Sequence, residues 1–162
     1  MIAKERRYRP NAAVFVTDGQ GQILLCSRND GTPYLQTVQG GIDAGETARQ
    51  AAIREMSEEL GLAPESFEII AEATQRHRYE WTRSYIQSII EKFGSRPNFD
   101  GQEQQYFLAQ IDRATEFVLD AHHQEFSSVR WGSPAELIEK SWPPKTIGFR
   151  QALQEFGLLP RD

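Results

Sequence analysis

The sequence predicts an α+β fold, built as a mixed β-sheet with helices packed on its faces. Three observations indicate this class. Short apolar, β-branched segments recur between residues 11 and 132, one amphipathic helical pattern interrupts them after residue 46, and two further helical patterns close the chain. Because no repeat, low-complexity tract or linker divides the 162 residues, we expect one domain over residues 1–162.

The chain is expected to open with a β-hairpin. Residues 11–17 and 23–27 are apolar and rich in strand-forming residues, and the sequence DGQG between them supplies turn residues. The next segment, TPYLQTVQGG, is predicted to be short and extended, and it runs into Gly40 and Gly41.

A helix is expected to follow these glycines. It starts near Glu46 and Thr47 and ends at Gly61, a residue favoured after helix ends because it accepts a positive φ. One side of the helix is apolar and carries Ala48, Ala51, Ala52, Met56 and Leu60.

The remaining chain is predicted to return to strands and then to helices. The expected strands are residues 67–74, 76–81, 85–90, 103–111 and 127–132, with a loop over residues 91–102. A helix should begin at Ser133 as N-cap with Pro134 in its first turn. The last helix is indicated by Phe149, Ala152, Leu153 and Phe156, and it closes at Gly157.

Composition and charge narrow the function classes. Hydrophobic residues make up 39% and charged residues 25% of the chain, and no apolar run is long enough for a membrane span or a signal peptide. The single cysteine, Cys26, lies in an apolar segment, which indicates a buried thiol and a cytoplasmic setting. The net charge of −5 argues against general affinity for nucleic-acid backbones.

The predicted first helix carries an unusual concentration of acid. Glu55, Glu58 and Glu59 share one arc, since each helical residue turns by about 100°. Like charges at this spacing repel, so the pattern is either a solvated acidic face or a site. Hard oxygen ligands in this arrangement suit Mg²⁺ or Mn²⁺, and Arg54 can form an ion pair with Glu58 one turn on.

The spacing of residues over the longer stretch 40–62 favours a metal site over a solvated acidic face. The fixed positions are Gly40, then after five residues Glu46, and after seven more Arg54, Glu55, Met56, Glu58, Glu59, Gly61 and Leu62. Residues 40–62 thereby resemble the Nudix hydrolase signature at every fixed position. The resemblance implies an α/β/α sandwich with a loop–helix–loop motif, a divalent metal, and attack of water on a diphosphate linkage.

The resemblance also implies a role for each signature residue. Glu55, Glu58 and Glu59 become metal ligands or the base, and the carbonyl of Gly40 becomes a further ligand, with two or more Mg²⁺ or Mn²⁺ ions once substrate is bound. Glu46 is expected to organise the loop, and Arg54 to orient the glutamates. Which glutamate is the base stays open.

Segments outside the signature resemble the bacterial dinucleoside polyphosphate hydrolases and RNA 5′-pyrophosphohydrolases. They are YRPNAAVFV, GQEQQYFL, EFSSVRW and, more weakly, PPKTIGFRQALQEF. By this resemblance Glu125 is a further metal ligand or base. The candidate substrate contacts are Arg9, Arg28, Gln39, Tyr79 and Lys145, although a surface position is an alternative for Arg9, Arg28 and Lys145.

The sequence departs from this subfamily just before the glycines. Where the subfamily has Trp-Gln-Phe-Pro, this chain has Leu35, Gln36, Thr37 and Val38. Stacking of a base on an aromatic ring is worth about 1–3 kcal/mol, and Thr37 does not supply it. The base preference therefore stays open. The adjacent His122 and His123 are interpreted as solvent-exposed imidazoles rather than as a transition-metal site.

Three functions are considered. The first is a metal-dependent Nudix pyrophosphohydrolase acting on a dinucleoside polyphosphate or on the 5′-triphosphate end of RNA. The second keeps this chemistry for nucleoside triphosphates, nucleotide sugars or another diphosphate-linked metabolite. The third is a non-catalytic nucleotide or RNA sensor, which turnover would exclude. The oligomeric state is not specified by the sequence.

Overall fold

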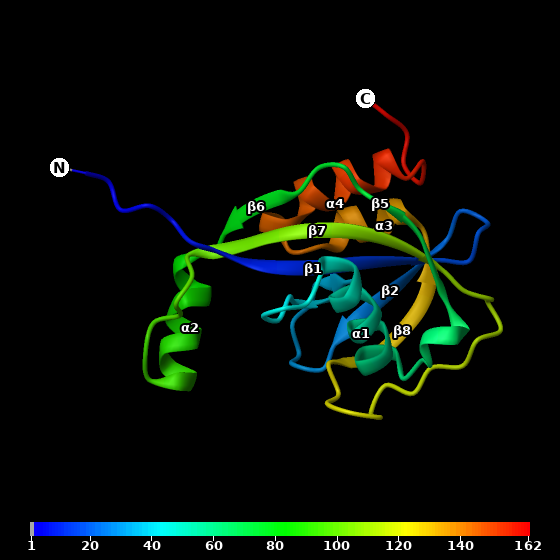
Figure 1. Cartoon of the computed structure of the whole chain (residues 1–162), viewed down its shortest axis with the longest axis horizontal. Helices are drawn as coiled ribbons and strands as arrows, with labels where there is room; N and C mark the ends of the chain where they lie inside the picture. Colours follow the sequence, from blue (N-terminus) through cyan, green and yellow to red (C-terminus); the bar gives the residue numbers. More distant parts are fainter. Residues whose placement is uncertain (1) are drawn as a thin grey trace.

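The computed structural model describes residues 2–162. Within them the chain forms one eight-stranded sheet and four α-helices (Figure 1). The strands are β1 (Tyr8–Thr17), β2 (Ile23–Arg28), β3 (Leu35–Gln36), β4 (Val38–Gly41), β5 (Glu68–Glu72), β6 (His77–Glu80), β7 (Gly101–Gln110) and β8 (Phe126–Gly132). The helices are α1 (Ala48–Leu60), α2 (Arg83–Phe93), α3 (Pro134–Lys140) and α4 (Pro143–Glu155), with a short 3₁₀ turn at Pro64–Ser66.

The sheet is mixed, as expected. Strands β1 and β7 run parallel to each other over ten residue pairs, from Tyr8 opposite Gly101 to Thr17 opposite Gln110. The other pairings are antiparallel: β1 with β2 and β4, β2 with β3 and β8, and β7 with β5 and β6. Parallel neighbours need a long connection, and the chain between β1 and β7 contains both α1 and α2.

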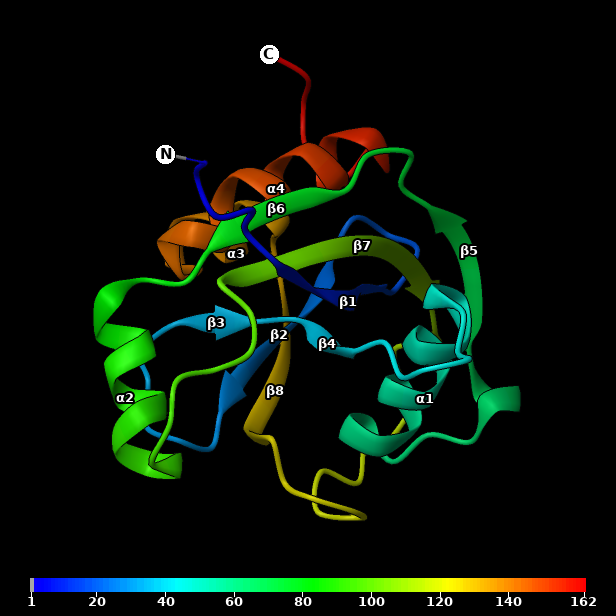
Figure 2. The ribbon, with the colours of Figure 1, turned by 60° about the vertical axis from the view of Figure 1, so that its left-hand side comes forward.

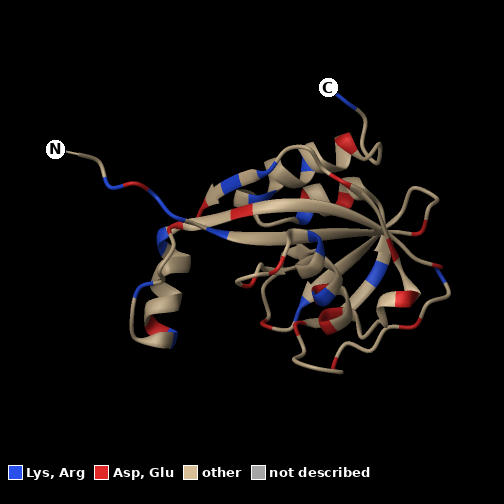
Figure 3. Cartoon of the chain, viewed as in Figure 1, with Lys and Arg blue, Asp and Glu red and all other residues tan. Residues whose placement is uncertain are grey.

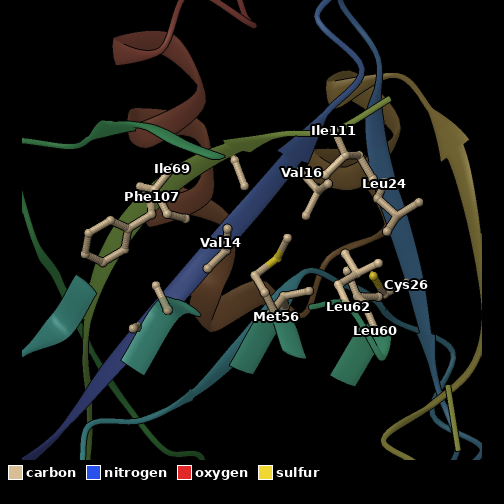
Figure 4. Close-up of a cluster of buried hydrophobic side chains, with 14 of the residues drawn as sticks. Val14, Val16, Leu24, Cys26, Met56, Leu60, Leu62, Ile69, Phe107 and Ile111 are labelled. Atoms are coloured by element: carbon tan, nitrogen blue, oxygen red, sulfur yellow. The ribbon is translucent and has the colours of Figure 1, made fainter. Parts of the chain in front are cut away.

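Helices cover both faces of the sheet, which confirms the layered architecture. Successive residues of β1 point to opposite faces, so Val14 and Val16 pack on one side while Ala13 and Phe15 pack on the other. The first side meets Met56 and the rest of the apolar stripe of α1 (Figure 4). The second side meets α3 and α4, which Figure 1 places across the sheet from α1.

The caps of α1 agree with the sequence. The Thr47 hydroxyl accepts from the backbone N–H of Gln50, and the Gln50 side chain accepts from the backbone N–H of Thr47. At the other end Gly61 has φ 67°, a left-handed conformation that glycine adopts at low cost. Two further predictions are confirmed: Ser133 is the N-cap of α3, and Cys26 is buried.

The prediction of a strand at residues 85–90 is wrong, because the segment belongs to α2. The Thr82 side chain caps the helix by accepting from the backbone N–H of Tyr85, and Gly94 with φ 81° ends it. Both caps lie outside the β-branched run that suggested a strand. No helix of residues 2–162 is long and apolar enough to cross a membrane.

Candidate active site

Strand β4, the following loop and α1 form one unit that positions the acidic residues. Pairing with β1 places Gly40 opposite Ala12 and Gly41 opposite Asn11. In the loop, the backbone N–H of Asp43 donates to Glu46 Oε1 at 3.0 Å. The expected role of Glu46 in organising this loop agrees with that geometry.

Arg54 ties the loop to the helix. Its guanidinium donates to both Glu46 oxygens at 2.8 and 2.9 Å, and these hydrogen bonds lower the pKa of Glu46 to about 2. The same group donates to Glu55 Oε1 at 2.7 Å, to Glu58 Oε2 at 3.3 Å and to the Gly41 carbonyl at 2.9 Å. The predicted pair with Glu58 is therefore present as one contact of a larger network. Figure 3 shows basic and acidic positions side by side on α1.

The glutamates differ in their surroundings. Glu59 is only 5% exposed, and its Oε2 atom has no hydrogen-bond partner among the described residues. Burial, followed by the neighbouring charge of Glu55, raises the pKa of Glu59 well above its usual value. Burial also raises the pKa of Glu55, although Arg54 opposes the shift. Glu58 is the more exposed of the three.

Glu125 approaches from a different part of the chain. It precedes β8, and its backbone carbonyl accepts from the N–H of Asn29 at 2.9 Å, which fixes this loop against the end of β2. Glu125 and Glu59 line the same cleft, and the charge of Glu125 is one of the causes that raise the pKa of Glu59.

The donors fit a hard divalent cation. An unpartnered, buried carboxylate oxygen is costly, and a cation supplies the missing partner. A Cβ added to Gly40 would lie 2.8 Å from Cγ of Glu55, so only glycine leaves that carboxylate room beside the Gly40 backbone. However, no three His, Cys, Asp or Glu side chains of residues 2–162 are grouped tightly enough to hold an ion by themselves. Arg54 instead engages Glu55 and Glu58.

These residues open onto a cleft of about 670 Å³. Ten of the eleven predicted site residues line it, namely Arg9, Arg28, Gln39, Gly40, Glu55, Glu58, Glu59, Tyr79, Glu125 and Lys145. The exception is Arg54, which lies behind the carboxylates it contacts. The lining residues come in part from α1, β4, β3 and α2, and in Figure 2 the two strands lie between the two helices.

The two predicted arginines line the cleft in different ways. Arg9 lies across the backbone of Gly41, since a Cβ there would come within 2.8 Å of the Arg9 Cζ atom. Arg28 donates through Nε to Asp30 at 2.9 Å, and both side chains are partly exposed. Both guanidinium groups are thus available to an anion in the cleft.

Lys145 is a buried amine rather than a surface lysine. It is 4% exposed and donates to Gln36 Oε1 at 3.1 Å. Burial, and then the positive charge of Arg28, lowers the pKa of Lys145 to about 7. Sequence reasoning left a surface position open for Lys145 because its burial depends on the distant β3 segment.

Tyr79 and Gln39 are held by neighbours in the sheet. The Tyr79 hydroxyl donates to Gln102 Oε1 at 2.8 Å, and burial raises the pKa of the phenol. Gln39 accepts from the Gln104 side chain at 2.8 Å. Neither contact points to a role in proton transfer, and both fix the orientation of groups that line the cleft.

The structure adds aromatic residues that sequence reasoning did not assign to the site. Tyr34, Trp81, Tyr85 and Trp142 all line the cleft. Their local sequence carries no signal for this position, which depends on α2 and the start of α4 meeting the cleft. His122 and His123 also line the cleft and are exposed, as expected.

The chain matches known proteins over nearly its whole length. A family model described as NUDIX domain matches residues 7–153. The RNA pyrophosphohydrolase of Novosphingobium aromaticivorans is 37% identical over 154 residues, which are 92% of each chain. That of Aeromonas hydrophila is 34% identical and covers 94% of this chain and 85% of its own.

Solved structures share the fold at lower identity. The dihydroneopterin triphosphate pyrophosphohydrolase of E. coli has a TM-score of 0.72 at 20% identity, covering 94% of this chain and 97% of its own. An Ap4A hydrolase binary complex of C. elegans has a TM-score of 0.64 at 18% identity, covering 93% and 99%.

Proposed function

This chain belongs to the NUDIX family and is a pyrophosphohydrolase, and we propose that it cleaves a diphosphate linkage in a nucleotide-linked polyphosphate. The proposed substrate is the 5′-triphosphate end of an RNA or a dinucleoside polyphosphate, with residues 1–162 acting as one domain. The curated relatives at 32–37% identity, which are RNA pyrophosphohydrolases, support this substrate class.

The observation that carries the proposal is the pairing of opposite charges in one cleft. Carboxylates from α1 and from the loop before β8 line it together with Arg9, Arg28 and Lys145. A polyphosphate carries several negative charges along a short chain, and guanidinium groups suit its oxygens. The cations bind one end of such a chain while the other end reaches the carboxylates.

Members of this family use divalent metal ions such as Mg²⁺. In this chain Glu55, Glu58, Glu59, Glu125 and the Gly40 carbonyl would hold two or more Mg²⁺ or Mn²⁺ ions. When bound, the ions neutralise charge on the phosphate oxygens and lower the pKa of water.

The chain's own residues supply the remaining steps. A glutamate of the cluster accepts a proton from the attacking water. Arg54 orients Glu55 and Glu58 through the hydrogen bonds described above. With a pKa of about 7, Lys145 is only partly protonated near neutral pH, and a phosphate beside it favours its protonated form, so substrate binding increases its charge.

A second candidate substrate class follows from one observation at β3–β4. The Thr37 side chain is buried and its hydroxyl donates to the Val14 carbonyl, so it offers no surface to a base. This feature favours nucleoside triphosphates or nucleotide sugars, for which a different part of the cleft would select the base. The sensor alternative is disfavoured, since Glu55, Glu58 and Glu59 are all kept in the cleft.

A product assay tests the proposal. Diadenosine tetraphosphate, a short 5′-triphosphorylated RNA, nucleoside triphosphates and nucleotide sugars are incubated with Mg²⁺ and then Mn²⁺, and products are identified by mass. We expect fastest turnover of the RNA end or the dinucleotide, with Glu58→Gln as the inactive control. Preference for a triphosphate or a nucleotide sugar would select the second class, and binding without turnover would select the sensor.

A further inference from the structure

Aromatic rings form one wall of the cleft. The ring centroids of Trp81 and Tyr85 are 5.4 Å apart, and those of Tyr85 and Trp142 are 5.6 Å apart. Tyr79 continues the series, with its ring 5.9 Å from that of Trp142. The rings come from β6 and the residue after it, from α2, and from the N-cap residue of α4. Figure 2 shows β6 leading into α2.

Tyr79 is buried, but the other three rings are not part of the hydrophobic core. Tyr85 is 40% exposed, Trp81 and Trp142 are half-buried, and α2 has no buried residue at all. Exposed aromatic surface costs solvation free energy, and where it is contiguous it commonly marks a binding site. Here the contiguous rings line the same cleft as the carboxylates and cations.

The aromatic wall adjoins the cationic part of the cleft. The Lys145 amine lies 6.0 Å from the centroid of the Trp142 ring. A nucleotide whose phosphates contact Lys145 and the arginines therefore has its base within reach of the rings. The cleft thus offers carboxylates, cations and aromatic rings to the scissile linkage, the phosphates and the base of such a substrate.

We propose that Tyr85, supported by Trp81 and Trp142, is a stacking subsite for the nucleobase of the substrate. The inference deepens the proposed function and rests on its assignment of the cleft to a nucleotide polyphosphate. Every base has a π-face, so stacking on these rings selects a nucleotide over a base-free polyphosphate without strong preference for one base. The subsite takes over the contact that Thr37 does not make.

The test compares substrates with and without a base in four proteins. The proteins are the wild type, Tyr85→Ala, Tyr85→Phe and, as matched control, Phe93→Ala. Phe93 lies on the same helix and is 68% exposed, but it does not line the cleft. The ligands are diadenosine tetraphosphate for kinetics, a non-hydrolysable adenosine triphosphate analogue for equilibrium binding, and inorganic tripolyphosphate as the base-free probe, all with Mg²⁺.

Tyr85→Ala is expected to raise KM for diadenosine tetraphosphate and Kd for the analogue on the order of 10-fold, with kcat changed less than about 2-fold. Tyr85→Phe keeps the ring and should restore both values, and Phe93→Ala should leave them unchanged. Affinity for tripolyphosphate should be the same in all four proteins.

Unchanged KM and Kd in Tyr85→Ala would overturn the proposal, and so would an equal loss of tripolyphosphate affinity, which indicates a general disturbance of the cleft. Failure to bind the analogue in the wild type would overturn it too. If the wild type hydrolyses none of the substrates but binds the analogue in a Tyr85-dependent way, the proposed function fails and the stacking subsite stands.

Discussion

Replacing Gly40 by alanine is expected to remove activity while leaving the fold largely stable. Gly40 has an ordinary backbone conformation, so alanine adds no backbone strain. Its Cβ would lie 2.8 Å from Cγ of Glu55 and closer still to the carboxylate, whereas ordinary contacts begin at 3.4 Å. Cγ must therefore withdraw by about 0.6 Å and the carboxylate by more.

The two consequences of this displacement differ in size. Glu55 ends in a flexible carboxylate beside a cleft, so the main loss of stability is its 2.7 Å hydrogen bond from Arg54, worth about 1–2 kcal/mol. For a chain of this length that corresponds to a fall in Tm of about 2–8 °C. Misplacement of a catalytic group by about 1 Å commonly costs about 100-fold in rate, and we expect that loss in kcat/KM.

The assay combines phosphate or pyrophosphate release in Mg²⁺ with thermal unfolding of the same samples. Gly132→Ala is the matched control, because its Cβ would collide with the buried Leu25 side chain but Gly132 does not line the cleft. That variant should lose stability and keep its activity per folded molecule. Activity of Gly40→Ala within about 3-fold of wild type would refute the reasoning, since Glu55 would then tolerate a displacement of this size.

Three further predictions concern the cleft. Glu58→Gln should abolish turnover and remove the Mg²⁺-induced rise in Tm. The control Glu139→Gln, on α3, should do neither. Near-normal activity of Glu58→Gln would show that Glu58 is not a metal ligand. Arg54→Lys should lower activity about 10- to 100-fold because a single ammonium does not replace the guanidinium contacts, and unchanged rates would show that the network is dispensable. In the folded protein the pKa of Lys145 is about 7, compared with 10.5 for an ordinary lysine. Between these two pH values the unfolded state binds more protons than the folded state. The stability of the wild type should therefore rise with pH over this range, by up to about 1.4 kcal/mol per pH unit. Lys145→Met should remove this pH dependence. The free energies of unfolding of both proteins are measured in urea from about pH 7 to 10, and the same pH dependence in both would show that burial does not disfavour the charged form of Lys145.

Local signals were sufficient for α1 and its surroundings. Thr47 and Gly61 are caps whose geometry depends on their immediate neighbours, and the apolar stripe of α1 meets whichever face of the sheet it covers. In α2 the same kind of local signal was present in Thr82 and Gly94, but the β-branched residues between them favoured a strand. No residue of α2 is buried, so the caps rather than core packing identify this helix.

In the candidate site, too, some positions follow from local sequence and others depend on contacts between distant segments. The positions of Glu55, Glu58 and Glu59 follow from helical spacing. Arg54 reaches the first two from the same helix. The burial of Lys145 follows from the contact between α4 and β3, which are separated by more than a hundred residues. The aromatic wall likewise needs α2 and α4 to meet, and no spacing within one segment encodes that meeting.

The distribution of charge around α1 explains how a stable fold tolerates this cluster of glutamates. Arg54 contacts Glu46, Glu55 and Glu58, so one cation offsets part of the repulsion among these three carboxylates. Glu59 lies beyond its reach, buried, with one oxygen unpartnered and its pKa raised by burial and by Glu55. Burying such a group lowers stability, and sequences keep such groups mainly where function requires them. Glu59 is thus the carboxylate whose charged form is most costly to bury, and it gains most from a cation in the cleft.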